Sequence, residues 1–405
     1  MDKRVDSRLS DKHITTNYMK EFQCIGGECS DNCCTSSWTI SIDKPTYYKY
    51  KAIDDPALRS KLDASIKKFK GDRSSEKFGY IVPQNGKRCV FQSDCGLCEI
   101  HSDLGEDALS KTCRTYPKRV KKFQNASFLT GMTSCPEVTR LCLENPIKPI
   151  EVNAEANLSP KLAIGKTTSD CEVELLLQTV DAIDESNLHP AMQVIFLMQL
   201  VKWFQTNASV PSEIELKIFS DQLLLKIASL GSSIDPMDAA IFQYSFFDRV
   251  VLERNYNANA KEPIAILIKN IANGLMYRSV AKANSIALYL NGKNTVLFDF
   301  ESKNPGLFSR LLINEIYGNA ELFIHGNSAA DAILRKIVAR MAFTRFMLSG
   351  CANAMGVEFA MDDYIKCVYL TARSLEHDPK KSDILESALR QRGDDPLIAS
   401  ALLLV

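Results

Sequence analysis

The placement of cysteines is the feature that most constrains how this chain can fold. Ten of its thirteen cysteines lie within residues 24–142. In a reducing compartment, such a concentration of thiols is more often a metal site or a catalytic site than a set of disulfides. The ten cysteines occupy positions 24, 29, 33, 34, 89, 95, 98, 113, 135 and 142. We therefore expect the N-terminal third of the chain to be organised around thiol chemistry.

The compartment is predicted from the N-terminus and from the hydropathy pattern. The first twenty residues are rich in charged side chains and contain no apolar core of a signal peptide. The longest strongly apolar run, near 192–201, is far shorter than the roughly 18 residues that indicate a membrane span. These patterns predict a cytoplasmic protein without a membrane partner.

The first group of cysteines, residues 24–34, places four thiols within eleven residues. Gly26 and Gly27 allow the backbone to turn tightly there and to bring N–H groups close to sulfur. The second group, residues 89–113, contains one CxxC pair, formed by Cys95 and Cys98. Thiolates are soft ligands that suit iron–sulfur clusters and zinc.

Three interpretations of these thiols remain open, namely an iron–sulfur cluster, a zinc site and a thiol redox device. A zinc site needs only four ligands and often shows two CxxC knuckles. Only one CxxC occurs here, and at least seven cysteines are available as ligands. The pattern therefore favours an iron–sulfur cluster, although it does not fix the number of centres.

The periodicity of apolar residues predicts an α-rich (α+β overall) protein with two domains. Residues 1–145 are expected to form an irregular, cysteine-rich, metal-binding domain with short strands near 37–42 and 80–82 and a helix over 56–69. Residues 146–160 have the composition of a linker. Residues 161–405 are expected to form a mainly helical domain with its own core.

Within the second domain, the run from Pro190 to Phe204 is apolar on nearly all sides and predicts a buried central helix. Asn291-Gly292 is a strong turn signal and predicts a strand pair over 285–290 and 295–300. Further helices are expected over 172–183, 213–229, 237–253, 261–273, 306–317, 328–349, 361–375, 380–391 and 395–404.

The charge distribution is uneven, although the formal net charge of the chain is zero. Residues 1–150 contain 25 Lys and Arg against 19 Asp and Glu, and the remainder contains 24 against 30. A chance difference between two domains explains this asymmetry. A basic surface that meets an acidic partner explains it as well.

The cysteine motifs resemble those of the zinc- or iron-chelating proteins with a CxxCxxCC signature, although the first spacings are longer here. The residues that carry this resemblance are Cys33-Cys34, Cys89-x-Phe91, Cys98-x-Ile100-His101 and Cys113-Arg114-x-Tyr116-Pro117. Within that group the chain is similar to the flagellin lysine-N-methylases. The supporting segments are Tyr18-x-x-x-Phe22-x-Cys24, Trp38-Thr-Ile40, Leu104-Gly105-Glu106 and Ser134-Cys135-Pro136-Glu137.

The resemblance implies a protein-lysine N-methyltransferase that acts on flagellin. It implies S-adenosylmethionine as the methyl donor and dependence on an iron–sulfur cluster, expected to be of the 4Fe–4S type. No nucleic-acid partner is expected. The expected metal ligands are Cys24, Cys29, Cys33, Cys34, Cys89, Cys98, Cys113 and Cys135. Cys95 falls outside the broader pattern.

The catalytic groups and the donor site are less defined. Glu99, Tyr116 and Glu137 are candidates for deprotonating the substrate lysine by their position in the motifs, and each is equally a packing or solvated residue. The sequence shows no glycine-rich methyltransferase motif and no CxxxCxxC triad, because Ser36 occupies the last position. A non-enzymatic zinc- or iron-binding scaffold is the alternative function.

Overall fold

The computed structural model describes residues 12–35, 39–71, 74–84, 88–152, 168–186, 188–230, 235–253 and 262–376, with short pieces near the C-terminus. It divides into two compact units. One unit comprises residues 22–119 and 135–137, and the other comprises residues 1–21, 120–134 and 138–405. The chain is mostly helical, which confirms the predicted α-rich class. The predicted domain bounds of 1–145 and 161–405 stay a prediction.

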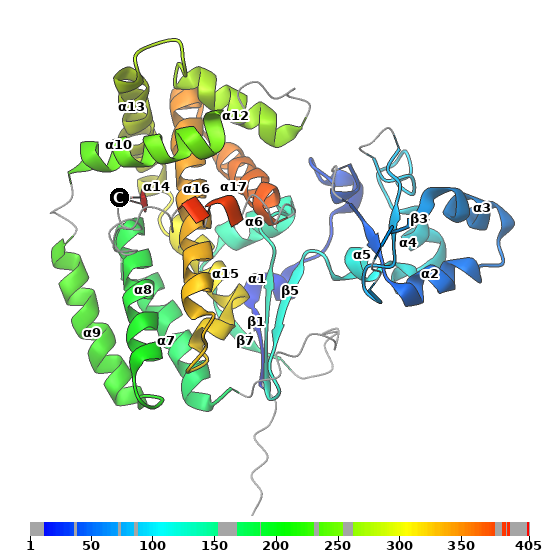
Figure 1. Ribbon diagram of the computed structural model, residues 1–405, viewed down its shortest axis with the longest axis horizontal. Helices are drawn as coiled ribbons and strands as arrows, with labels where there is room; N and C mark the ends of the chain where they lie inside the picture. The colour runs from blue at the N-terminus through cyan, green and yellow to red at the C-terminus, as the bar shows by residue number, and fades with distance from the viewer. Residues whose placement is uncertain are drawn as a thin grey trace, which may run out of the picture. The chain divides into compact units, whose positions relative to one another are not determined.

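The cysteine-rich unit contains a small three-stranded antiparallel sheet in the order β2-β4-β3. The strands are β2 (Ser41–Ile42), β4 (Gly79–Ile81) and β3 (Ile66–Lys68). Its helices are α2 (Lys44–Lys51), α3 (Pro56–Ser65), α4 (Glu99–Leu104) and α5 (Lys111–Thr115), with the short turns η1 (Gly26–Glu28), η2 (Cys33–Thr35) and η3 (Glu106–Ala108) (Figure 1).

The starts of α2 and α3 are fixed by aspartate caps that are followed by proline. Asp43 accepts a hydrogen bond from the backbone N–H of Thr46 at 3.0 Å, and Asp55 accepts one from that of Leu58 at 2.8 Å. Asp43 also accepts the backbone N–H of Lys111 at 2.8 Å, which ties the start of α2 to the start of α5. Burial by itself raises the pKa of Asp43, but these donors outweigh it and lower the pKa.

The other unit contains a four-stranded sheet in the order β5-β6-β1-β7. The strands are β5 (Lys118–Lys122), β6 (Ala126–Gly131), β1 (Lys12–Thr16) and β7 (Pro149–Glu151). Strand β1 pairs in parallel with β6 and antiparallel with β7. Strand β7 lies inside the segment 146–160 that the sequence predicts as a linker, whereas residues 153–167 lie outside the described residues.

The helices of this unit surround α16 (Ala330–Met355), which is buried along most of its length (Figure 1). The prediction of a buried helix at 190–204 is confirmed by α8 (Pro190–Thr206). The other helices are α1 (Asn17–Glu21), α6 (Pro136–Glu144), α7 (Asp170–Glu185), α9 (Glu213–Leu230), α10 (Pro236–Phe247), α12 (Pro263–Gly274), α13 (Lys282–Asn291), α14 (Phe298–Lys303), α15 (Leu307–Gly318) and α17 (Met361–Glu376), with the helical turns η4 (Asp248–Leu252), η5 (Gly292–Leu297), η6 (Ala320–Phe323) and η7 (Gly356–Glu358).

The predicted strand pair at 285–290 and 295–300 is wrong, because this segment is continuously helical through α13, η5 and α14. Gly292 is needed for close approach and not for a hairpin turn. A Cβ atom on Gly292 would lie 2.3 Å from the carbonyl oxygen of Ser349 in α16. The predicted helix over 56–69 is too long, because α3 ends at Ser65 and Ile66 pairs with Ile81 of β4. Most of the segment covering the predicted helices at 380–391 and 395–404 lies outside the described residues.

Candidate metal centre

The two cysteine loops are locked together through their backbones. The N–H of Cys89 donates to the carbonyl oxygen of Cys34 at 2.7 Å. Gly27 lies directly against the backbone of Gly96, because a Cβ on Gly96 would stand 2.8 Å from the Cα of Gly27. Gly96 also has a φ of +81°, which favours glycine. The glycines therefore allow one loop to lie on the other.

Asn32 holds the same junction with its side-chain amide. Its Nδ2 donates to the carbonyl oxygens of Gly26 at 2.9 Å and Gly96 at 3.3 Å, one from each loop. Its Oδ1 accepts the N–H of Cys34 at 2.8 Å. Asn32 thus fixes the Cys33-Cys34 turn against the second loop. The sequence analysis missed this residue, and its position directly before two adjacent cysteines was the available signal.

The thiols of five cysteines interact with one another at this junction. The thiol of Cys34 is hydrogen-bonded to those of Cys33 and Cys89, and Cys98 and Cys113 are close enough to interact with them electrostatically. The hydrogen bonds and burial raise the pKa of Cys34, whereas the hydrogen bond from Cys34 lowers the pKa of Cys89. Burial raises the pKa of Cys113 to about 12 and also raises the pKa of Cys98.

The sulfur atoms lie against an apolar wall. Cys34, Cys98 and Cys113 pack on a buried cluster that includes Cys89, Phe91 and Ile42. Burial raises the pKa of the Tyr50 phenol in the same cluster, and the nearby thiols of Cys113 and Cys98 raise it further. An apolar surrounding of this kind excludes water and opposes the ionisation of the thiols.

The donor set suits a thiophilic metal, because it offers five electrostatically interacting thiols that cannot all ionise together without a cation. All thirteen cysteines are free thiols. As the described residues stand, no group of three or more His, Cys, Asp or Glu is arranged so that it could hold a metal ion. The predicted ligand set therefore stays a prediction, although the chemistry of the five thiols fits a sulfur-ligated centre.

The other predicted ligands lie less centrally. Cys29 is half-buried and interacts electrostatically with Cys33 and Cys24, and Cys24 itself is exposed. Cys135 belongs to the same compact unit as the two loops. Cys95, which falls outside the predicted ligands, is exposed, and its sulfur lies 3.0 Å from the hydroxyl of Ser93.

The three candidate catalytic residues have different surroundings. Glu99, the first residue of α4, forms an ion pair with Lys61 of α3. Tyr116 is half-buried directly after α5, and Glu137 is buried in the first turn of α6. Lys61 was missed by the sequence analysis. Its ammonium lies 5.8 Å from the ring of Phe91, and its charge lowers the pKa of Cys89.

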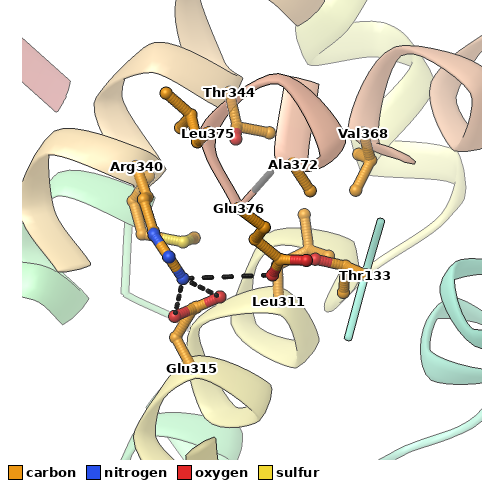
Figure 2. A pocket seen from close by; sticks show the side chains of 10 residues that line it. Thr133, Leu311, Glu315, Arg340, Thr344, Val368, Ala372, Leu375 and Glu376 are labelled. Carbon is orange, nitrogen blue, oxygen red and sulfur yellow. Dashed lines mark hydrogen bonds and ion pairs between the residues drawn. The ribbon is translucent and has the colours of Figure 1, made fainter. Parts of the chain in front are cut away.

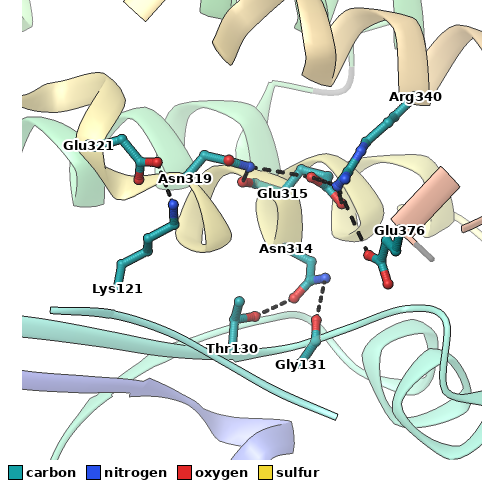
Figure 3. A network of polar contacts seen from close by, with 9 residues as sticks. All are labelled: Lys121, Thr130, Gly131, Asn314, Glu315, Asn319, Glu321, Arg340 and Glu376. Atoms are coloured by element: carbon teal, nitrogen blue, oxygen red, sulfur yellow. Dashed lines mark hydrogen bonds and ion pairs between the residues drawn. The ribbon is translucent and has the colours of Figure 1, made fainter. Parts of the chain in front are cut away.

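The helical unit has a polar region of its own around α15, α16 and α17. Arg340 donates to Glu315 at 3.1 Å and lies 4.0 Å from Glu376, as Figures 2 and 3 show. The side chains of Glu315 and Glu376 are only 8% and 3% exposed. They line a pocket of about 30 Å³ beside apolar side chains such as Leu311 and Val368 (Figure 2). This volume is enough for one or two water molecules.

A second polar group of the helical unit joins the sheet to α15. Asn314 accepts a hydrogen bond from the hydroxyl of Thr130, and its Nδ2 donates to the carbonyl oxygen of Gly131 at 3.1 Å (Figure 3). Asn314 also accepts a hydrogen bond from the hydroxyl of Tyr18. The hydroxyl of Tyr18 also accepts the N–H of Gly131 at 2.9 Å. Tyr18, part of the motif that precedes Cys24, is thus a buried structural residue.

Comparison with known proteins identifies one matching family model and several similar sequences. Residues 176–403 match the family model of the FliB lysine N-methylase C-terminal domain. A stretch of 139 residues is 32% identical to the flagellar biosynthetic protein FliU of Salmonella muenchen, and it covers 33% of this chain and 80% of that protein.

Two proteins called lysine-N-methylase, from Salmonella choleraesuis and Salmonella typhimurium, are also 32% identical over 139 residues. The aligned stretch covers 33% of this chain and 34% of each relative, so the chain spans about a third of the length of these curated relatives. No solved structure matches the chain. In the described residues, no helix is both long enough and apolar enough to cross a membrane.

Proposed function

The chain belongs to the FliB lysine N-methylase family, and from this premise we propose that it is a protein-lysine N-methyltransferase that acts on flagellin. The observation that carries the proposal is the match of residues 176–403 to the C-terminal domain of that family. The relatives called lysine-N-methylase support the reaction, and the relative called a flagellar biosynthetic protein supports a flagellar substrate.

We further propose that the cysteine-rich unit is an irregular metal-binding domain that holds an iron–sulfur cluster. Cys33, Cys34, Cys89, Cys98 and Cys113 supply the central ligands, because their thiols interact electrostatically with one another. Cys24, Cys29 and Cys135 are the additional ligands in the same unit. Such a cluster supplies redox chemistry, or an open iron position that orients a donor. Asn32 and the glycines hold the two loops in register around the sulfur atoms.

The acceptor lysine must be neutral when it attacks the methyl group. A free lysine has a pKa near 10.4, so only about one in 2,500 is neutral at pH 7. With S-adenosylmethionine as donor, the amine lone pair forms the new N–C bond while the S–C bond breaks, and the excess proton leaves the amine. Glu99, Tyr116 and Glu137 are the groups that we propose for accepting this proton. The neighbouring Lys61 keeps the Glu99 carboxylate oriented.

The proposal is tested with purified full-length chain, flagellin and S-adenosylmethionine, followed by mass measurement of the flagellin. We expect mass increments of whole methyl groups that map to lysines and that require both enzyme and donor. Visible absorption and iron analysis of the purified protein test the cluster separately. If flagellin stays unmodified after incubation with S-adenosylmethionine and the folded, iron-loaded protein, the proposed activity is overturned.

A metal-binding scaffold is the second candidate, because the cysteines gather in a compact unit that a bound metal could stabilise. This function predicts stoichiometric zinc, a colourless protein and no methyl transfer. The same preparation therefore separates the two functions, since metal content and methylation are measured independently.

A further inference from the structure

Helix α2 and strand β3 gather lysines around a group of aromatic rings in the cysteine-rich unit. The rings of Tyr47 and Tyr48 lie 5.6 Å apart, and that of Phe78 lies 5.1 Å from Tyr47. The ammonium of Lys68 lies 5.1 Å from the ring of Tyr47 and 5.3 Å from that of Phe78. That of Lys51 is 5.6 Å from the same Tyr47 ring. We call Lys44, Tyr47, Tyr48, Lys51 and Lys68 the lysine–tyrosine patch.

The patch concentrates positive charge that its surroundings neutralise only at Lys51 among the residues that the structure describes. The ammonium of Lys44, the first residue of α2, lies 6.0 Å from the ring of Phe78. Lys51 is paired with Asp63 at 2.5 Å. Lys44 and Lys68 are exposed, and neither has a carboxylate partner among the residues that the structure describes. Residues 44–77 contain ten Lys and Arg against five Asp and Glu. Cations held close together on a surface favour the binding of an anionic partner.

The aromatic rings make the patch more than a charged surface. Ammonium groups over ring faces are attracted by the ring quadrupole, so the lysine side chains are held in place before a partner arrives. Tyr48 is 53% exposed and offers apolar area between the charges. Tyrosine is enriched at protein-binding surfaces, where its ring supplies contact area, and the lysines around Tyr48 add charge that selects an acidic partner.

Three observations favour a polypeptide over other anionic partners. The faces of Tyr47 and Phe78 are occupied by lysine ammonium groups, so they are not free to stack on nucleic-acid bases. Strand β3 is the last strand in the order β2-β4-β3, and Lys68 lies on it. An edge strand presents backbone groups with which an extended peptide can pair. Helix α2 lacks a broad exposed apolar face of the kind that binds membranes.

We propose that the lysine–tyrosine patch is a docking surface for an acidic segment of the protein substrate. This inference rests on the proposed function for the identity of the partner. The binding of an acidic polypeptide to the patch does not depend on that function. The acidic segment pairs with Lys44 and Lys68, and it contacts the exposed ring of Tyr48. The patch contributes to substrate binding without touching the reacting atoms.

The test uses the full chain with both patch lysines reversed, Lys44→Glu with Lys68→Glu, beside a second variant, Lys44→Gln with Lys68→Gln. The matched control reverses two exposed lysines of α9, Lys217→Glu with Lys226→Glu. Binding of a fluorescein-labelled glutamate-rich peptide is measured by anisotropy at low and high salt. We expect about tenfold weaker binding for the charge reversal, a smaller loss for the neutral variant, and little change for the control.

Equal peptide affinity for the wild type and the folded neutral and reversed variants would overturn the docking surface. The same holds if the α9 control loses as much affinity as the reversal. A labelled single-stranded oligonucleotide and phosphatidylglycerol vesicles are tested in parallel. Binding of either one in place of the peptide, lost in the patch variants, would overturn the polypeptide assignment.

Flagellin methylation then separates this inference from the proposed function. If the wild type methylates flagellin, the reversed variant should show a raised KM at nearly unchanged kcat, because docking acts before the chemical step. A lowered kcat at unchanged KM would contradict a docking role. If the wild type does not methylate flagellin, the proposed function fails, and the peptide measurement still decides whether the patch binds acidic polypeptide.

Discussion

Replacement of Lys293 by methionine should stabilise the helical unit near neutral pH. Lys293 is only 3% exposed, and its ammonium lies 3.3 Å from Oε1 of Gln243, which also accepts the hydroxyl of Tyr289 at 2.7 Å. Burial first, and then the positive charge of Arg345, lower the pKa of Lys293 from 10.5 to about 7. Arg345 is itself buried and paired with Glu301 at 2.5 Å.

The positive charges around Lys293 also affect the pKa of a nearby histidine, His189. Burial and the charges of Arg345 and Lys293 lower the pKa of His189 to about 3, so His189 is neutral between pH 7 and pH 9. The pKa of Tyr289 is raised by burial, so its hydroxyl keeps its proton. Lys293 is therefore the group in this cluster whose ionisation changes between pH 7 and 9.

The direction of the pH effect follows from proton uptake on unfolding. Between the folded pKa of about 7 and the unfolded value of 10.5, the unfolded chain binds a proton that the folded chain has released. The free energy of unfolding therefore rises with pH in this window. The full destabilisation, present below pH 7, is on the order of 5 kcal/mol, and about 2 kcal/mol of it is recovered between pH 7 and pH 9.

Methionine has a similar volume and removes the charge, but it also removes the hydrogen bond to Gln243, a loss of about 1 kcal/mol. We therefore expect Lys293→Met to raise the free energy of unfolding by about 2–3 kcal/mol at pH 7, and the gain over the wild type to fall by about 2 kcal/mol by pH 9. Urea unfolding followed by far-UV circular dichroism at both pH values measures this. Lys226→Met, an exposed lysine of α9, is the control and should change little. A difference between variant and wild type that is independent of pH would refute the reasoning.

Three further outcomes are expected. In the Cys98→Ala variant, the helical unit should stay folded, but the protein should lose iron and flagellin methylation. Near-normal methylation by a folded, iron-free variant would mean that the metal centre has only a structural role. Cys95 should be alkylated before the other cysteines in the native protein, because it is exposed and the hydroxyl of Ser93 lowers its pKa. Peptide mapping identifies the alkylated residue, and iron analysis should show that the modification leaves the iron content unchanged. Gly292→Ala should lower the free energy of unfolding by about 2 kcal/mol or more, because its Cβ would meet α16, and a calorimetric unfolding temperature equal to the wild type would contradict this.

The sequence was most informative where one pattern determined the local structure. The apolar run from Pro190 becomes the buried helix α8, because a helix that is apolar on nearly all sides is stable only when other elements surround it. The spacing of the cysteines indicated which loops carry the thiols, and the structure brings Cys34 and Cys89 into contact. The identity of the bound metal is not encoded in spacing alone, since zinc and iron–sulfur centres share the same sulfur ligands.

The residues that sequence reasoning missed act through tertiary contacts. Asn32 matters because its amide meets a carbonyl oxygen of its own loop and that of Gly96, which lies 64 residues further along the chain. Lys61 matters because α3 places its charge near Cys89 and its ammonium beside Glu99. Asn32 lies inside the first cysteine group and Lys61 lies outside both groups, but a search for ligand spacing considers only the cysteines and so passes over both residues. Only the arrangement of helices and loops reveals their contacts.

The Asn291-Gly292 pair shows why a local signal can fail. Two-residue turns need glycine for its positive φ, and this requirement makes Asn-Gly a strong hairpin signal. Here the residue after the pair's glycine, Lys293, is buried, and Gly292 itself is helical with a φ of −57°. The glycine is required because the backbone of η5 approaches Ser349 and Asn353 of α16 too closely for any side chain. Glycine meets both requirements, a positive φ in a turn and the absence of a side chain at a close helix contact. Only the position of α16 therefore distinguishes the two cases. Lys293 follows this close approach in η5 and is itself buried, so the predicted pH dependence of stability rests on helix packing that the sequence pattern did not predict.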